Sequence, residues 1–544
     1  MSINLDPEAV NGQSPPPPGR VTTILIVLLA VVIFVTATAV LLIMKQRSEA
    51  MALLRPTVTP GRLLTTATPA QPGKTPVATS PTVTGASGRA TGTLPLPTAT
   101  RQPGQLPLSP TVVSAAGSPT AAPSPTKAAP TVAARAWYFG EGASVPPFRT
   151  WYAILNPGNQ ATNVMLTLYP ENGKPVQRNV AVAPGTQMRV LANEILPNAA
   201  FGAGITSDQP VYVERFTLGD RDGTTSSGLS PANTWYFPEG ETADDFTVWL
   251  LVLNPGTTPA NLTVTYMIYR PEETTQPVVK KYVAPPTSRL TIDGRKDVPA
   301  DVMGIMVESD QPVVVEQSLY FDNQKAAYGG GGATSLSTTW YVASANTQEG
   351  FTSRLAVLNP NKQPAVVKVT MIGSKSGRAQ DSLSVPPLSK NDIVLNEDMD
   401  GQLVAAVLES DQPVAVVRAT DYMSGGDNPV LAAYSAQASA TAAGQWFLPE
   451  TMTGSDYDSY VAIFNPATTP ASATVTYYTD QGQPISKVYT VAPMTCLTIR
   501  VADDVTGKMV VAAGVSSTQP VVVERTTMFR RSVGASSSAG IPAR

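Results

Sequence analysis

The stretch that decides the fold is SDQPVYVER at residues 207–215, because the same nine-residue pattern occurs three more times along the chain. It reads SDQPVVVEQ at 309–317, SDQPVAVVR at 410–418 and STQPVVVER at 517–525. In each copy Gln-Pro lies at a boundary between apolar runs. Proline donates no backbone N–H and disfavours helix in the residue before it. The pattern therefore predicts two short strands joined by a corner.

Three further markers accompany each copy in the same order. An aromatic cluster opens every unit, at Trp137, Trp235, Trp340 and Trp446. An Asn-Pro follows nineteen residues after each Trp, and Val-Ala-Pro or Val-Pro-Pro comes next, at Val182, Val283, Val385 and Val491. Four collinear markers in four copies indicate tandem repeats of one structural unit.

Each repeat is predicted to be all-β. Segments such as LTVTYMIY after Asn261 alternate apolar and polar residues with period two, and residues 136–544 show no sustained helical period. Six or seven short strands in about 100 residues are typical of an immunoglobulin-like β-sandwich. We expect four such repeats, at 135–232, 233–337, 338–443 and 444–544, arranged end to end so that they reach outward.

The residues before the repeats predict a membrane anchor and a stalk. Residues 21–44 form an uncharged apolar run of 24 residues. As a helix it would be about 36 Å long, enough to cross a bilayer core, and it is longer than the apolar region of a cleaved signal peptide. We interpret 1–20 as a short cytoplasmic tail, 21–44 as a signal-anchor helix and 45–134 as a disordered Pro/Thr-rich stalk.

The expected orientation has the N-terminus in the cytoplasm and the repeats outside the cell. Lys45 and Arg47 follow the apolar run directly, and by the positive-inside rule they favour the opposite topology. Long domains translocate largely regardless of flanking charge, and the Pro/Thr-rich composition is typical of extracellular stalks. We therefore expect a single-pass cell-membrane protein with extracellular repeats.

Composition narrows the possible chemistry. The chain of 544 residues contains no histidine, which excludes Ser-His-Asp and Cys-His nucleophilic systems and His-ligated metal sites. The formal net charge of −3 gives no indication of nucleic-acid binding. The single cysteine, Cys496, lies in an apolar strand pattern and is predicted to be a small buried hydrophobic residue rather than a reactive thiol.

The repeat pattern W-Y-F-x-E-G, L-N-P, V-A-P and D-Q-P-V-V-V-E-R resembles an uncharacterised family of tandem β-sandwich repeats in bacterial envelope proteins. The resemblance covers about three quarters of the chain. It implies surface display and supplies no catalytic residues. Repeat 3 departs from the pattern, because it lacks the Glu-Gly after Trp340-Tyr341 and has Val417 where the other repeats have Glu214, Glu316 and Glu524.

Several residues are candidates for binding, each with a structural alternative. The four opening tryptophans, Trp137, Trp235, Trp340 and Trp446, are candidates for stacking on sugar rings, against the alternative that they pack in the core. The Glu-Arg pairs, such as Glu214-Arg215, are expected to form ion pairs at the surface or at the ends of the sandwiches. Calcium is considered at acidic pairs between repeats, and glycosidase chemistry at single glutamates near the openers, but neither set has the required spacing. The acidic pairs are Asp220/Asp222, Asp244-Asp245 and Asp503-Asp504, and the glutamates are Glu141, Glu239 and Glu450.

We expect a non-catalytic, membrane-anchored structural or adhesion protein of the cell surface, without a cofactor or bound metal. Its expected partners are the membrane, a cell-wall polymer or surface glycan, and other surface proteins or further copies of itself. A glycan-binding module is the first alternative. An envelope sensor is the second, and it would need a partner, because a tail of 20 residues is too short to fold as a signalling domain.

Overall fold

The computed structural model describes residues 136–543, with gaps at 271–275, 322–325, 376, 424–430, 481–482, 508–509 and 530–533. The described residues belong to one compact unit. The predicted tail at 1–20, the predicted helix at 21–44 and the predicted stalk at 45–134 lie outside them. Within the described part of the chain, no helix is long and apolar enough to span a membrane.

The first repeat consists of two antiparallel four-stranded sheets. One sheet has the order β1-β6-β3-β4 and the other the order β5-β2-β7-β8. A 3-10 helix, η1 (Ala192–Glu194), follows β5. The strands are β1 (Ala136–Phe139), β2 (Arg149–Asn156), β3 (Thr162–Pro170), β4 (Val176–Val182), β5 (Thr186–Leu191), β6 (Phe201–Ser207), β7 (Tyr212–Leu218) and β8 (Gly223–Ser227).

The other three repeats reproduce this arrangement, except that one long strand replaces the pair β6 and β7. Repeat 2 comprises β9 (Ala232–Phe237), β10 (Thr247–Asn254), β11 (Ala260–Ile268), β12 (Val278–Ala284), β13 (Ser288–Asp293), α2 (Gly294–Asp297), β14 (Met303–Phe321) and β15 (Ala326–Gly331). Repeat 3 comprises β16 (Ser337–Asn346), β17 (Phe351–Asn359), β18 (Ala365–Gly373), β19 (Arg378–Val385), β20 (Ser389–Val394), η2 (Leu395–Glu397), β21 (Leu403–Met423) and β22 (Leu431–Gln437). Repeat 4 comprises β23 (Ala443–Leu448), β24 (Tyr457–Asn465), β25 (Ala471–Thr479), β26 (Ile485–Val491), β27 (Thr495–Arg500), α3 (Val501–Asp504), β28 (Val511–Phe529), β29 (Gly534–Ala539) and β30 (Ile541–Pro542).

The Gln-Pro motif is the point at which the chain passes from one sheet to the other. The first half of β14 pairs with β11 and β9, whereas its second half pairs with β10 and β15. The pairing with β9 shifts register between Glu308 and Val313, across the Ser-Asp-Gln-Pro segment. The predicted corner is therefore present, as an irregularity within a long strand in repeats 2–4 and as a break between β6 and β7 in repeat 1.

This crossing distributes the two halves of the corner strand over both sheets of each sandwich. The strand that follows, β8 in repeat 1, pairs with β7 in the same sheet. The predicted all-β sandwiches are therefore present.

Two of the repeated motifs are tied to others by the same side-chain bonds in every repeat. The indole N–H of each opening Trp donates to the carbonyl of the Val after Gln-Pro, for example from Trp137 to Val211 at 2.7 Å. The Asn of each Asn-Pro is fully buried and its amide bridges its own loop to the Val-Ala-Pro strand, as Asn156 does to the carbonyls of Gln160 and Val182. These contacts require a fixed distance along the chain between the motifs, which accounts for their constant spacing.

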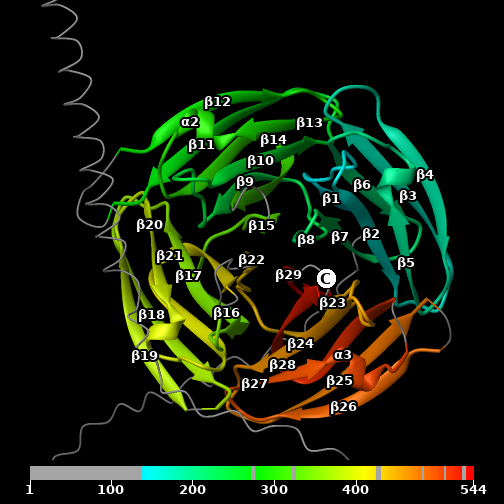
Figure 1. Ribbon diagram of the computed structural model, residues 1–544, viewed down its shortest axis with the longest axis vertical. Coiled ribbons are helices and arrows are strands. Elements are labelled where there is room, and N and C mark those ends of the chain that lie inside the picture. The colour runs from blue at the N-terminus through cyan, green and yellow to red at the C-terminus, as the bar shows by residue number, and fades with distance from the viewer. Residues whose placement is uncertain are drawn as a thin grey trace, which may run out of the picture. The chain divides into compact units, whose positions relative to one another are not determined.

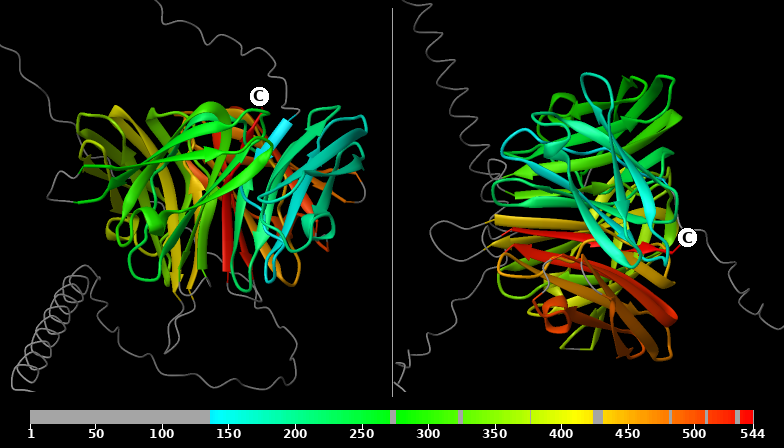
Figure 2. Two further views of the ribbon diagram at one scale, coloured as in Figure 1. Left: turned by 90° about the horizontal axis from the view of Figure 1, so that it is seen from above. Right: turned by 90° about the vertical axis from the view of Figure 1, so that its right-hand side faces the viewer.

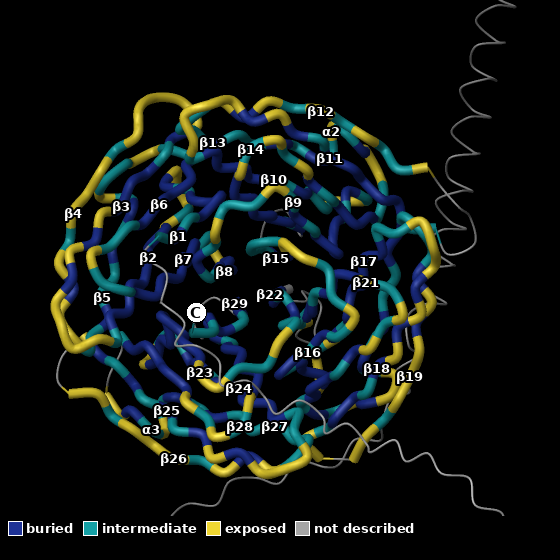
Figure 3. The backbone as a smooth tube through the Cα atoms, turned by 180° about the vertical axis from the view of Figure 1, so that it is seen from behind, coloured by how far each residue is buried: buried dark blue, intermediate teal, exposed yellow. Residues whose placement is uncertain are grey.

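The four repeats close into a ring (Figure 1). Phe447, Ala512 and Ile541 of repeat 4 pack in the same apolar cluster as the core of repeat 1, which places the last repeat against the first. Strands run between the two faces of the ring (Figure 2), and burial increases from its rim to its centre (Figure 3). The end-to-end, outward-reaching arrangement expected from the sequence is therefore wrong.

Candidate functional site at the ring axis

Four strands surround the centre of the ring, one from each repeat: β8, β15, β22 and β29 (Figure 3). Within its sheet each pairs only with the preceding corner strand, so each has an edge that pairs with no other strand. Unpaired strand edges carry backbone N–H and C=O groups that require partners when buried. The polar groups at the axis are arranged to meet this requirement.

A single carboxylate, Asp222, accepts backbone N–H bonds from all four repeats. Its two oxygens lie 2.9 Å from the amide nitrogen of Gly223, 3.2 Å from that of Ala327, 3.0 Å from that of Ala433 and 3.0 Å from that of Ala535. The strand registers show that these four residues occupy the same position in their repeats. Burial raises the pKa of the Asp222 carboxyl to about 7, although the four N–H groups lower it.

The other repeats have small residues at the position of Asp222, namely Ala326, Ala432 and Gly534. A Cβ atom on Gly534 would lie 2.9 Å from a carboxylate oxygen of Asp222 and 2.4 Å from the carbonyl oxygen of Arg221. The axis therefore has room for one acidic side chain, and that side chain serves all four repeats.

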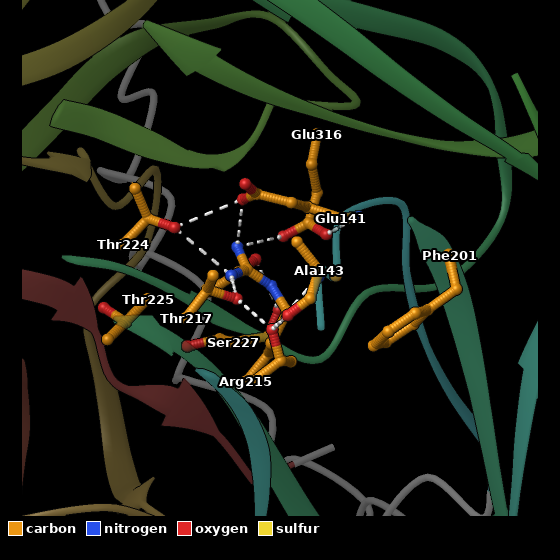
Figure 4. A network of polar contacts seen from close by, with 12 residues as sticks. Glu141, Ala143, Phe201, Arg215, Thr217, Thr224, Thr225, Ser227 and Glu316 are labelled. Carbon is orange, nitrogen blue, oxygen red and sulfur yellow. Dashed lines mark hydrogen bonds and ion pairs between the residues drawn. The ribbon is translucent and has the colours of Figure 1, made fainter. Parts of the chain in front are cut away.

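A buried ion pair joins repeat 1 to repeat 2 near the axis (Figure 4). Arg215 contacts Glu316 of repeat 2 at 3.3 Å and Glu141 of its own repeat at 2.8 Å. Its other amino group donates to the hydroxyls of Thr217 and Thr224. Burial opposes the charge of the guanidinium, but the two carboxylates outweigh burial and raise the pKa of Arg215.

The same pairing recurs at two of the other three interfaces. Arg418 of repeat 3 contacts Glu524 of repeat 4 at 3.1 Å. Arg525 of repeat 4 contacts Glu214 of repeat 1 at 2.9 Å, which closes the circle. The Glu-Arg pairs predicted at the surface or at the sandwich ends are instead buried between repeats. The sequence prediction was wrong because a surface position was assumed for side chains that the ring covers.

The interface between repeats 2 and 3 lacks this pair, and both partners are replaced. Gln317 stands in repeat 2 where the other repeats have Arg, and Val417 stands in repeat 3 where they have Glu. The two departures from the repeat pattern thus meet at one interface. Gln317 keeps one bond of the missing Arg, because its amide donates to the carbonyl of Glu239 at 2.6 Å as Arg525 does to that of Glu450.

A different ion-pair network joins repeats 2 and 3. Glu239 of the opener in repeat 2 contacts Arg354 at 2.6 Å and Lys390 at 2.9 Å in repeat 3. Arg354 also contacts Asp421, which accepts a hydrogen bond from the hydroxyl of Tyr328 in repeat 2. Burial opposes ionisation of Glu239, but Arg354 and Lys390 outweigh it and lower its pKa to about 2.

The lowered pKa of Glu239 predicts how acid weakens this interface. Its contribution to stability is complete above pH 4.5, the pKa in the unfolded chain, and is lost as the pH falls through about 2. The expected loss is about 3 kcal/mol over that window. Urea unfolding at pH 6, 4.5, 3 and 2.5 measures it, and in Glu239→Gln this part of the acid dependence should be missing. Equal acid dependence in the two proteins would contradict the assignment.

The interface between repeats 3 and 4 differs again. Repeat 3 lacks the opener glutamate, and repeat 4 has Cys496 at the strand position that Arg289 and Lys390 occupy in repeats 2 and 3. Cys496 packs beside an apolar cluster that includes Ala343 of repeat 3 and Phe464 of repeat 4. At this interface the opener glutamate of repeat 3 and the basic residue of repeat 4 are thus both replaced by small residues.

The thiol of Cys496 is expected to react slowly in the folded protein. Burial, with a contribution from Glu524, raises its pKa to about 12, so very little reactive thiolate is present at pH 8. Reaction with a disulfide reagent should be about 1,000-fold slower than for free cysteine and should become fast in guanidinium. Asn159→Cys, at an exposed position, supplies a matched thiol that reacts at the ordinary rate. Cys496 is half-buried, so a rate within tenfold of that of the exposed thiol would show that its surroundings do not suppress the thiolate.

The four opening tryptophans are 0 to 3% exposed and each lies in the apolar core of its repeat. No ring face is left open on which a sugar could stack, so the structure supports the packing alternative. Of the acidic pairs considered for calcium, Asp222 belongs to the axis and Asp504 accepts hydrogen bonds from Tyr477 and Tyr489. Within the described residues, no group of three or more acidic, Cys or His side chains is placed to hold a metal ion.

One repeat of the chain matches a protein-family model. Residues 333–428, which cover most of repeat 3, match a family model described as a family of unknown function, DUF5719. No curated protein matches the chain.

Two solved structures share low similarity with the chain. Protein 1070 of Thermotoga maritima is 14% identical, with 18% of this chain and 90% of that one covered and a TM-score of 0.17. A tetra-tandem repeat from the extending region of a large adhesion protein is 12% identical, with 72% of this chain and 93% of that one covered and a TM-score of 0.10.

Proposed function

We propose that the protein is a non-catalytic surface protein, anchored by the apolar segment at 21–44, that displays its four repeats outside the cell as one closed head. The observation that supports a structural role is the use of the repeated charged residues. Glu214, Glu316 and Glu524 each pair with an arginine of the neighbouring repeat. The motif that recurs most faithfully in the sequence thus serves assembly of the ring.

A ring suits display for a physical reason. Repeats joined in a row flex at each junction, whereas closure makes every repeat contact two neighbours. Breaking one buried ion pair by removal of a partner costs about 3–5 kcal/mol, so the interfaces resist opening. The head therefore presents its loops in fixed relative positions, which favours simultaneous contact of several loops with an extended partner such as a wall polymer.

Substituted cysteines test the anchored, outward-facing topology. Asn159→Cys lies on an exposed loop of the ring, and Asp6→Cys lies in the predicted cytoplasmic tail, both in a Cys496→Ala background. A membrane-impermeant maleimide is expected to label Asn159→Cys on intact cells and Asp6→Cys only after permeabilisation. The reverse pattern, or recovery of the full chain in the soluble fraction, would refute the proposed display.

A specific feature keeps glycan binding as a second candidate. A groove of about 280 Å³ lies where repeat 4 meets repeat 1, lined by Tyr478 and by the side chains of Gln160, Gln209 and Gln445. Planar amides and a half-buried aromatic ring suit sugar hydroxyls and ring faces. Full-length protein in detergent should then co-sediment with isolated cell walls, and Tyr478→Ala should reduce this binding. Unchanged binding by Tyr478→Ala would remove the groove from consideration.

A further inference from the structure

A cavity of about 220 Å³ lies at the ring axis and is lined by residues of all four repeats. Asp222 precedes β8 and binds the first residues of the inner strands, whereas the cavity is lined by residues further along them, such as Ser227 and Gln437. Asp222 itself does not line the cavity, whereas Glu239 of the ion-pair network between repeats 2 and 3 does.

The cavity is lined by the residues at which repeats 2 and 3 depart from the pattern. Gln317 and Val417, which replace the missing Arg and Glu, both line it. So do the four glycines at 329–332, where repeats 1 and 4 have serine at two of the corresponding positions. The lining of this cavity therefore lacks the Arg and Glu side chains that fill the other three interfaces. It also lacks the small side chains that repeats 1 and 4 have at the positions of the glycines.

Two amide oxygens in this lining are available as acceptors. The amide nitrogen of Gln317 donates to the carbonyl of Glu239, and that of Gln437 donates to the carbonyl of Val416, both at 2.6 Å. These bonds fix the orientation of both amides, and neither Oε1 atom has a partner among the described residues. An amide oxygen accepts up to two hydrogen bonds, so each Oε1 atom can accept a hydrogen bond from a molecule in the cavity.

The charge of the lining favours an uncharged occupant. Glu239 is the only carboxylate in the described lining, and it is neutralised by Arg354 and Lys390. Phe237, Leu319 and Val417 provide apolar surface around the acceptors. A charged ligand would lose its hydration without gaining an unpaired counter-ion.

We propose that this axial cavity is a binding site for a small uncharged molecule that carries hydrogen-bond donors and an apolar side. The two amide oxygens accept from the donors, and the apolar lining packs against the remainder. The cavity is close in size to the lower end of known ligand pockets, which restricts the occupant to a small molecule. The proposal does not depend on the membrane topology.

Acetamide and acetate form the test pair, because they have the same shape and differ in charge and in donors. Xylose serves as a larger neutral probe. Saturation-transfer NMR on the full chain in detergent should show binding of acetamide or xylose at millimolar concentration and at least tenfold weaker transfer for acetate. Absence of transfer from both neutral probes at 100 mM, or equal transfer for acetate, would overturn the proposal.

The control variant restores the repeat pattern. Gln317→Arg with Val417→Glu introduces the pair found at the other three interfaces and fills the cavity with side chains the fold already accommodates. It is expected to weaken neutral-probe binding at least tenfold. Gln437→Leu, which removes one acceptor and keeps a similar volume, should weaken it about fivefold and guards against misfolding of the double variant. Binding that both variants leave unchanged, or that Tyr478→Ala at the groove abolishes, would place the probe elsewhere and overturn the proposal.

Discussion

Replacing Asp222 with alanine is expected to lower the free energy of unfolding by about 3–6 kcal/mol at pH 8, where the carboxyl is ionised, because buried N–H groups without an acceptor cost about 1–3 kcal/mol each. Four amides, from Gly223, Ala327, Ala433 and Ala535, would lose their shared acceptor at once. Some of this cost is recovered if water enters, which sets the lower value. Urea unfolding of the full chain measures the difference.

The matched control is Asp220→Ala. Asp220 is exposed and lies two residues before Asp222, so its removal should change stability by less than about 0.5 kcal/mol. Asp222→Asn should lower the stability by an intermediate amount, since its amide has one acceptor oxygen and places an NH2 donor against the backbone N–H groups. Equal stabilities for Asp222→Ala and Asp220→Ala would show that the axial carboxylate does not hold the repeats together.

The pKa of Asp222 adds a dependence on pH. Burial raises this pKa from 3.8 to about 7. Between pH 3.8 and pH 7, Asp222 is therefore protonated in the folded protein and ionised in the unfolded chain. The stability contributed by the group is complete below pH 3.8 and declines as the pH rises through 7, by about 4 kcal/mol in all. The difference between wild type and Asp222→Ala should therefore narrow from pH 5 to pH 8. A difference that widens over this range would contradict the raised pKa.

Replacing Glu450 with glutamine is expected to open the ring between repeats 4 and 1. Glu450 is buried and accepts from Arg189 at 2.5 and 2.8 Å and from the indole N–H of Trp151 at 3.1 Å. Removal of one partner of a buried pair costs about 3–5 kcal/mol, reduced here to about 2–4 because the Arg189 side chain is 29% exposed. This is the one interface of the ring that no covalent link between repeats reinforces.

Opening at this interface has a signature distinct from unfolding. The amides of β5 (Thr186–Leu191) should exchange faster and the radius of gyration should increase, while the thiol of Cys496, at the interface of repeats 3 and 4, stays slow. The double-mutant cycle with Arg189→Gln should give a coupling energy of at least about 1 kcal/mol. Rapid reaction of Cys496 in Glu450→Gln would mean that the whole ring unfolds, and unchanged β5 exchange would mean that this pair does not hold the interface closed.

The repeat pattern predicted the contents of each unit better than the arrangement of the units. Asn156 and its counterparts mark strand ends as expected, and the Gln-Pro corner is present, because both depend on local backbone chemistry. The closure of the ring depends on the angle between neighbouring repeats, and this angle arises from many packing contacts that no single motif encodes. Ion pairs such as Arg215–Glu316 join residues about 100 positions apart, so single-strand patterns do not reveal them.

One signal for these contacts was present in the sequence. Gln317 and Val417 depart from the pattern in adjacent copies, and the loss of the opener glutamate in repeat 3 accompanies Cys496 in repeat 4. Complementary departures in neighbouring repeats indicate residues that touch. Asp222 gave no comparable signal, because its partners are backbone N–H groups, which almost every residue carries whatever its side chain.

The contact between the last repeat and the first has a consequence for evolution of the chain. Ile541 pairs with Phe447 as Leu229 does with Tyr138, and both Ile541 and Phe447 pack in the apolar cluster of repeat 1, so repeat 4 closes the ring against repeat 1. A linear array of repeats can gain or lose an internal unit, because its two terminal repeats stay the same. Here a three-copy or five-copy chain would leave a gap or an overlap, and the four amides at Asp222 would no longer converge. The number of copies is therefore fixed by geometry, and the repeats are free to diverge in their surface loops but not in their number.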